Sequence, residues 1–186
     1  MDSNNDVVEM QRGLSQHPDF SPLGLRLLLP IDPCGEGLDE LWKHIVECDY
    51  AFDDFSRGKV EVWAASLADP YSLHFKFEDY GYAVVRDLQV TDSPCIHFCT
   101  WNNPRFRDVL ACGEELVSFV FNRFNVTRIT ARQPSYCKQA IKFATLLGFK
   151  FEGEMRNAIK SYGKHYNVQI HGLLKEEWQK RLARIK

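Results

Sequence analysis

Cysteine and histidine alternate in one short aromatic segment, and their side chains are suited to metal binding, nucleophilic attack or proton transfer. Cys95, His97 and Cys99 lie two residues apart within PCIHFCTW, residues 94–101, and so share one face of a predicted strand. Same-face residues on a strand are about 6.6–6.8 Å apart. Zinc bonds to sulfur or nitrogen are only about 2.0–2.3 Å long, so a flat strand presents these groups poorly to one ion. We therefore expect no metal site here.

His97 is the candidate for proton transfer. An imidazole with an ordinary pKa of about 6.5 exchanges a proton near neutral pH, as a general base must. A hydrogen-bonded, inert histidine in the sheet is the alternative, and the residue pattern leaves both open. The sequence contains no G-x-x-x-x-G-K-S/T, G-x-S-x-G or H-E-x-x-H motif that would assign another chemistry.

Hydrophobic periodicity predicts the elements that must hold this segment. A period of two predicts strands, and a spacing of three and four predicts helices. Strands are expected at residues 25–29, 60–64, 71–77, 83–85, 94–101, 126–131, 149–151 and 166–170. Helices are expected at 38–48, from beyond 104 to about 124, at 135–147 with Ser135 as N-cap and Gly148 as stop, and at 175–186. This order predicts a mixed α/β chain without internal repeats.

The composition limits the class of protein. Of 186 residues, 45% are apolar and 26% charged, which excludes a wholly disordered chain, a collagen-like fibre and a small disulfide scaffold. No apolar run approaches the roughly 20 residues of a membrane span. The net charge of −2 argues against a globally basic nucleic-acid binder. Residues 1–60 have a balance of −7 and residues 61–186 one of +5, so an anionic ligand is expected in the later part.

The N-terminal region and the cysteines indicate a compartment. Residues 1–22 are polar and contain Pro18 and Pro22, which predicts an N-terminal arm. The first residues lack the basic and apolar regions of a secretion signal. The six cysteines form no Cys-x-x-Cys pair, so we expect reduced thiols and a cytoplasmic location.

The segment from Val126 to Trp178 carries an ordered series of short motifs. Its pieces are a strand ending near Pro134, a helix finishing in Leu-Gly-Phe at 147–149, Glu152-Gly153 with Arg156, a turn at 163–167 and a last stretch ending in Glu-Glu-Trp at 176–178. This order resembles the C-terminal half of the GNAT superfamily of acetyl-CoA-dependent N-acetyltransferases. The resemblance is to the branch that acts on ribosomal-protein N-termini and to its small-molecule relatives. Residues 26–30 resemble the first strand of the family more weakly.

The resemblance implies a fold and a domain extent. Residues 23–178 are expected to form an α/β (α+β) GNAT fold, a mixed and mostly antiparallel twisted sheet flanked by helices. Residues 179–186 would follow as a basic C-terminal tail or helix end.

The resemblance also implies an acetyl-CoA site. In such a fold the strands at 94–101 and 126–131 part, and backbone groups of Phe98, Cys99, Thr100 and Trp101 pair with pantetheine. The N-terminus of the next helix faces the pyrophosphate, where an anion is favoured. The residues implied there are Arg105, Arg107, Ala111, Cys112 and Gly113, although Asp108 brings the opposite charge. Cys137 stands where the family often has Asn, and Ala144 where it often has a proton-donating Tyr; Tyr136 would point about 100° away in a helix.

The function implied is direct transfer of acetyl to a primary amine, on a peptide N-terminus or a small molecule. His97 would be the base, and direct transfer disfavours Cys99 as a covalent nucleophile. Glu78, Tyr82 and Tyr162 are the candidate substrate residues, although a solvated turn explains Glu78 better and an exposed polar turn explains Tyr162 equally well.

Departures from the family pattern leave two other hypotheses. One is a GNAT-like domain without catalysis that serves as a structural or binding component of a larger assembly, such as a phage particle, or of a homo-oligomer. A weaker one is nucleic-acid binding through the basic C-terminal half.

Overall fold

The computed structural model describes residues 25–88 and 91–185, so the predicted arm at 1–22 lies outside it. Among these residues no helix is long and apolar enough to cross a membrane. The elements in chain order are β1 (Leu29–Pro30), α2 (Leu38–Glu47), the 3₁₀ turn η2 (Asp49–Ala51), α3 (Val60–Leu67), β2 (Leu73–Phe77), β3 (Gly81–Arg86), β4 (Cys95–Thr100), α4 (Phe106–Arg123), β5 (Arg128–Pro134), α5 (Lys138–Leu147), β6 (Lys150–Ser161), β7 (Lys164–Leu174) and α6 (Lys175–Ile185).

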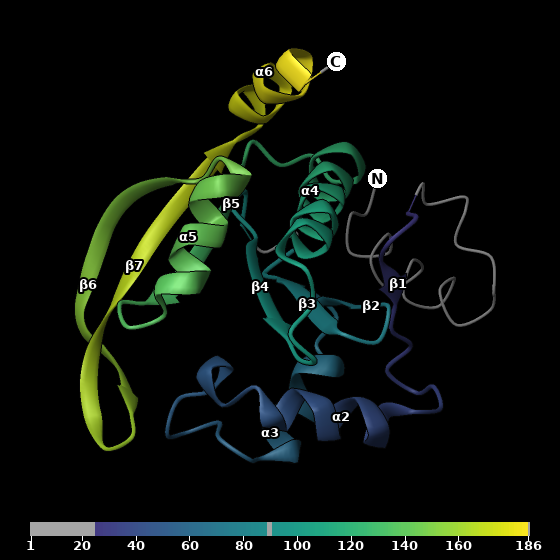
Figure 1. The fold of residues 1–186 in the computed structure, drawn as a ribbon, viewed down its shortest axis with the longest axis vertical. Helices are drawn as coiled ribbons and strands as arrows, with labels where there is room; N and C mark the ends of the chain where they lie inside the picture. Colours follow the sequence, from purple (N-terminus) through teal and green to yellow (C-terminus); the bar gives the residue numbers. More distant parts are fainter. Residues whose placement is uncertain (1–24, 89–90, 186) are drawn as a thin grey trace.

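Helices cover both faces of one seven-stranded sheet, whose strand order is β1-β2-β3-β4-β5-β7-β6 (Figure 1). Strand β3 shows why both faces are covered, because its side chains alternate between two cores. Ala83 and Val85 face a core shared with α4, α5 and α6, whereas Tyr82 and Val84 face one shared with α2 and α3. The expected mixed, mostly antiparallel sheet flanked by helices is confirmed.

Most predicted elements are confirmed, including the end of α5, where Gly148 takes the left-handed conformation at φ 99°. The strand predicted at 60–64 is wrong, because these residues form α3. An alternation that short fits a helix as well, and Trp63 and Leu67, four residues apart, pack together in the core under α3.

Two boundaries also differ from the prediction. Ser135 is not the N-cap of α5, because its N–H donates to Asn167 O and the helix begins only after Cys137. The first strand shrinks to Leu29–Pro30, because the Glu115 carboxylate binds the N–H groups of residues 26–28 at 2.8–2.9 Å. The helix predicted at 175–186 is present as α6, so residues 179–185 are its continuation.

The sheet is interrupted in its middle. Strands β3 and β4 pair along their full length, and β5 pairs with β7 over seven positions. In contrast, the parallel strands β4 and β5 pair only at Cys95–Thr130 and Ile96–Ala131. Beyond Ile96 and Ala131 the two strands part, as expected, and β6 and β7 lean away from β4 in Figure 1. This opening positions the candidate site.

Candidate functional site

The parting of β4 and β5 opens a cavity of about 360 Å³. Residues 96–98 of β4 and 131–134 of β5 form its two edges, and α5 closes one side. Residues 50–53, which follow α2, and four apolar residues of the β6–β7 hairpin supply further walls; the hairpin residues are Met155, Ala158, Ile159 and Val168. The cavity therefore passes through the sheet instead of lying on it.

The backbone of β4 leaves one free position in this opening. The Tyr50 hydroxyl accepts the Thr100 N–H at 2.8 Å and donates to the Thr100 carbonyl at 3.1 Å. The N–H of Trp101 points to the other side, where it bonds to Tyr80 O. Because alternate residues of a strand turn the same way, the N–H and C=O of Phe98 face the opening, as those of Thr100 do. Tyr50 thus limits the open backbone to Phe98.

A second, larger cavity of about 890 Å³ adjoins the first. The two cavities share lining residues, among them Tyr50, Phe98, Tyr136, Cys137 and Phe143. Its walls include Asn103, Pro104, Phe106 and Val109 around the start of α4, and Lys138, Gln139, Ala140 and Lys142 at the start of α5. Neither helix has a side-chain cap at its N-terminus. Free N–H groups, helix dipoles and two lysines make this cavity attractive to anions.

Solved structures share the fold of this chain, whereas no protein-family model and no curated protein matches it. A GCN5-related N-acetyltransferase from Brucella melitensis gives a TM-score of 0.60 at 16% identity, covering 83% of this chain and 79% of that one. A variant of the spermidine N-acetyltransferase SpeG from Vibrio cholerae gives 0.68 at 13% identity, covering 84% and 99%. The ribosomal-protein α-N-acetyltransferase RimL, in complex with coenzyme A, gives 0.66 at 13% identity, covering 81% and 95%. The chain has the GNAT fold. This confirms the fold that the C-terminal motifs predicted.

Within this fold, the predicted pyrophosphate residues fall into two groups. Arg105 and Arg107 lie at the start of α4, as expected, and both point to Asp108, with N–O distances of 2.9 and 3.8 Å. The negative charge of Asp108 is therefore balanced locally. Neither arginine lines either of these two cavities, so among the described residues Lys138 and Lys142 are the cations that reach the larger one.

Ala111, Cys112 and Gly113 lie in the interior of α4, away from both cavities. A Cβ added to Gly113 would meet Phe143 Cζ at 2.8 Å, so this glycine permits α4 and α5 to pack closely. The resemblance implied that these three residues lie at the N-terminus of the helix, facing the pyrophosphate, whereas the helix begins at Phe106 and they lie inside it. Their predicted contact with a cofactor has no support in this placement.

His97 lies at the first unpaired position of β4, in the wall of the smaller cavity. Desolvation lowers its pKa from 6.5 to about 4, and the charges of Arg86 and Arg132 lower it further. The side chain is nonetheless exposed, so solvent reaches the ring through the cleft. Cys95 Sγ lies 3.4 Å from His97 Nε2, and burial raises the pKa of this thiol to about 11. His97 is therefore uncharged at neutral pH and weaker as a base than an ordinary histidine.

The side chains of three other predicted cofactor residues, Cys99, Trp101 and Cys137, contact other parts of the protein. The Cys99 side chain is buried against Cys48, which together with burial raises the pKa of Cys99. Trp101 is buried, and its indole N–H donates to Asp79 O at 2.7 Å. Cys137 does line both cavities, directly before α5, and its Sγ lies 3.8 Å from Tyr50 O.

The structure does not bring the three predicted substrate residues together. Glu78 is exposed in the β2–β3 turn, and Tyr82 is buried with its hydroxyl bound to His74 and, at 3.2 Å, to the Trp63 indole. Neither lines a cavity. Tyr162 lies at the β6–β7 turn, where its hydroxyl donates to Asp49.

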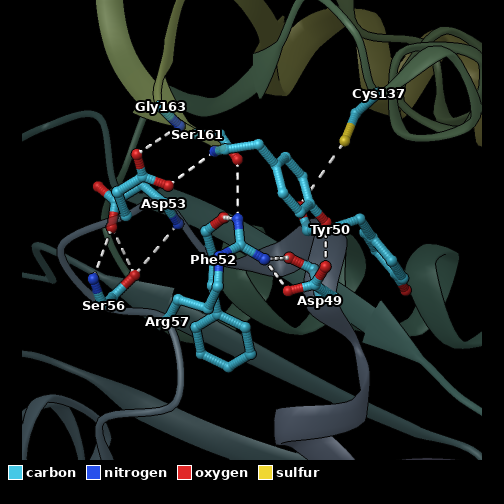
Figure 2. Close-up of polar contacts among 11 residues, drawn as sticks. Asp49, Tyr50, Phe52, Asp53, Ser56, Arg57, Cys137, Ser161 and Gly163 are labelled. Carbon is cyan, nitrogen blue, oxygen red and sulfur yellow. Dashed lines mark hydrogen bonds and ion pairs between the residues drawn. The ribbon is translucent and has the colours of Figure 1, made fainter.

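A tie between residues 49–57 and the β6–β7 turn was missed in the sequence. Asp54 accepts the N–H groups of Tyr162 and Gly163 at 2.7 and 2.9 Å. Arg57 pairs with Asp49 and donates to Ser161 Oγ at 2.8 Å (Figure 2). This tie holds the hairpin against the 49–57 segment at one end of the cleft. The segment has no periodicity, so no local signal identifies it.

Sequence reasoning also missed the polar groups at the centre of the cleft. The Tyr136 hydroxyl and Gln133 Oε1 are buried in the wall of the smaller cavity without a hydrogen-bond partner among residues 25–88 and 91–185. Tyr136 was expected to point away, but it lies in a turn before α5 and lines both cavities. Buried polar atoms without partners are uncommon and indicate a place for a ligand.

Proposed function

We propose that this chain transfers an acetyl group from acetyl-CoA to a primary amine. The observation that carries the proposal is the opening between β4 and β5, with the free peptide of Phe98 on its edge and uncapped helix N-termini at one end. The coenzyme A complex of RimL, which has the same fold, supports the choice of cofactor. When bound, acetyl-CoA supplies a thioester, from which the attacking amine takes the acetyl group while the thiol departs.

The residues divide this task between the two cavities. The N–H and C=O of Phe98 would hold the amides of the pantetheine arm, as an additional strand does. The starts of α4 and α5, with Lys138 and Lys142, would face the phosphates in the larger cavity. The Tyr136 hydroxyl, which borders both cavities, is the group we assign to donating a proton to the departing sulfur.

His97 would orient the acceptor amine instead of removing its proton at neutral pH. Its lowered pKa keeps the ring uncharged, so a ring nitrogen can accept a hydrogen bond from the amine. The amine must therefore arrive mostly unprotonated. This favours an α-amine, with a pKa of about 7.7–8.0, over a lysine-type amine near 10.4.

Calorimetric titration with acetyl-CoA tests the proposal, followed by release of coenzyme A thiol in the presence of an amine. The double variant Lys138→Gln/Lys142→Gln should bind acetyl-CoA about tenfold more weakly, and the difference should shrink at high salt. Lys164→Gln, an exposed lysine at the β6–β7 turn, is the matched control and should bind normally. If millimolar acetyl-CoA produces no heat of binding, the proposal is overturned.

The hypothesis of a non-catalytic assembly component is tested by the same preparation. A monomeric elution profile together with thiol release would count against it.

A further inference from the structure

The acceptor side of the cleft contains one arginine without a partner. Arg132 follows Ala131, the last residue of β5 that pairs with β4, and its side chain lines the smaller cavity. In the part of the chain that the structure describes, its guanidinium makes no hydrogen bond or ion pair. Arg57, at the tie beside the cleft, is instead paired with Asp49. Arg132 is thus a cation available to a ligand.

The carboxylates around the cleft are already engaged. Asp53 is the one acidic residue in the wall of the smaller cavity among the described residues, and its Oδ1 accepts the N–H and hydroxyl of Ser56 at 2.8 and 2.6 Å. Asp54 binds the β6–β7 turn, and Asp49 pairs with Arg57. A polycationic acceptor would therefore meet one occupied carboxylate and an unpaired guanidinium.

The remaining wall on this side is apolar. Cross-strand pairs place Pro134 opposite Val168 and Val168 opposite Met155, on the same face of the sheet as Arg132. Phe52 and Ile159 complete the wall. This surface suits a hydrophobic group and offers little to a polar chain.

Arg132 and His97 face each other across the opening. Each is the first residue beyond the last β4–β5 pair, and the strand alternation puts both side chains on the α2–α3 side of the sheet. A ligand between them would meet a neutral hydrogen-bond acceptor on one edge and a guanidinium on the other.

We propose that the acceptor is an amine that carries a carboxylate beside it on an apolar body, as an apolar α-amino acid does, and that Arg132 binds the carboxylate. The inference rests on the proposed acetyl transfer, because it assigns the amine to the edge at His97 and Phe98. A guanidinium matches a carboxylate with two parallel hydrogen bonds, and the adjacent amine then reaches the opposite edge of the opening. The proposal distinguishes this chain from one that accepts a polyamine or a protein N-terminus.

The test compares phenylalanine, phenylalaninamide and spermidine as acceptors by kcat/KM, from release of coenzyme A thiol. Phenylalanine and its amide are compared at a pH at which both α-amines are unprotonated, because loss of the carboxylate also lowers the pKa of the amine. Phenylalanine should then exceed its amide by about ten- to a hundredfold, since the amide lacks the charged carboxylate, and spermidine should be the poorest acceptor. Arg132→Gln should abolish the preference for phenylalanine over the amide. Arg156→Gln, which removes an exposed arginine of β6 outside both cavities, should preserve it.

Equal rates for phenylalanine and its amide would overturn the inference, as would a preference that survives in Arg132→Gln. Arg132→Lys, which keeps the charge and loses the paired hydrogen bonds, should show an intermediate preference and serves if Arg132→Gln fails to fold. Calorimetric binding of phenylalanine and its amide provides a readout independent of turnover. If no amine is acetylated, acetyl transfer fails, while tighter binding of phenylalanine through Arg132 would still support the anion site.

Discussion

Lowering the pH from 6.5 to 5 should remove a defined part of the folding free energy through His74. This side chain is only 3% exposed, its Nε2 lies 2.9 Å from Ser66 O, and its Nδ1 contacts the Tyr82 hydroxyl. Desolvation, reinforced by the charge of Arg86, lowers its pKa from 6.5 to about 4. Between these two pKa values His74 is protonated in the unfolded chain but not in the folded chain. The folding free energy that is present above pH 6.5 is therefore lost as the pH falls.

The size of this effect follows from the shift. Each unit corresponds to about 1.36 kcal/mol, so the loss through His74 is about 2 kcal/mol at pH 5 and about 3 kcal/mol at pH 4. The measurement stays at or above pH 5 because two carboxylates would add their own effect at more acidic pH. The pKa values of Glu40 and Glu177 are lowered from 4.5, so their contributions to the folding free energy are lost only below that range.

Urea unfolding at pH 7 and pH 5 measures the loss. His74→Gln should be less stable than wild type at pH 7, because a buried hydrogen-bonded group is altered, but should lose about 2 kcal/mol less between the two pH values. His97 and His171 are shifted in the same direction in both proteins, so their contributions cancel in the comparison. His165→Gln, at an exposed position of β7, is the control and should lose as much unfolding free energy between pH 7 and pH 5 as wild type does. Equal losses in wild type and His74→Gln would refute the reasoning.

The remaining predictions concern packing and catalysis. Gly113→Val should lower the free energy of unfolding by about 1–3 kcal/mol, because its Cβ would lie 2.8 Å from Phe143, whereas Gly153→Val has open space and should change it little. Tyr136→Phe should lower kcat by about a hundredfold with little change in the affinity for acetyl-CoA, and an unchanged kcat would exclude Tyr136 as the proton donor. The pH profile of kcat/KM should rise with deprotonation of the acceptor amine and show no inflection near pH 6.5; an inflection there that disappears in His97→Gln would restore His97 as the base.

The sequence predicted those parts of the fold that depend on local burial. Strands β2 and β7 and helices α2, α4 and α5 follow from the periodicity of their apolar residues, and Gly148 ended α5 as expected. The order of motifs after Val126 was enough to predict the GNAT fold. The prediction failed for α3, because eight residues that alternate weakly fit either period until Trp63 packs against the sheet.

The candidate site was predicted only in part, because its residues are distant in sequence. His97 was expected at the parting of the strands, and it lies there. Arg132 and Tyr136 gave no signal, since a charged residue in a strand and a tyrosine before a helix are ordinary until the structure shows which cavity they face. Gly113 was wrongly assigned to the cofactor site. Its role is to let α4 pack closely against Phe143 of α5, and a contact with another element leaves no signal in the local sequence.

The amino-acid sequence alone determined which residues form most of the helices and strands, because the side chains of one element are buried on one face whatever the element packs against. Only the tertiary structure decided where β4 stops pairing with β5 and what fills the opening. Tyr50 reaches Thr100 over 50 residues, and Asp54 holds the turn at Tyr162 over 108 residues. Contacts over such separations depend on how the whole chain is arranged, so no local pattern of residues records them.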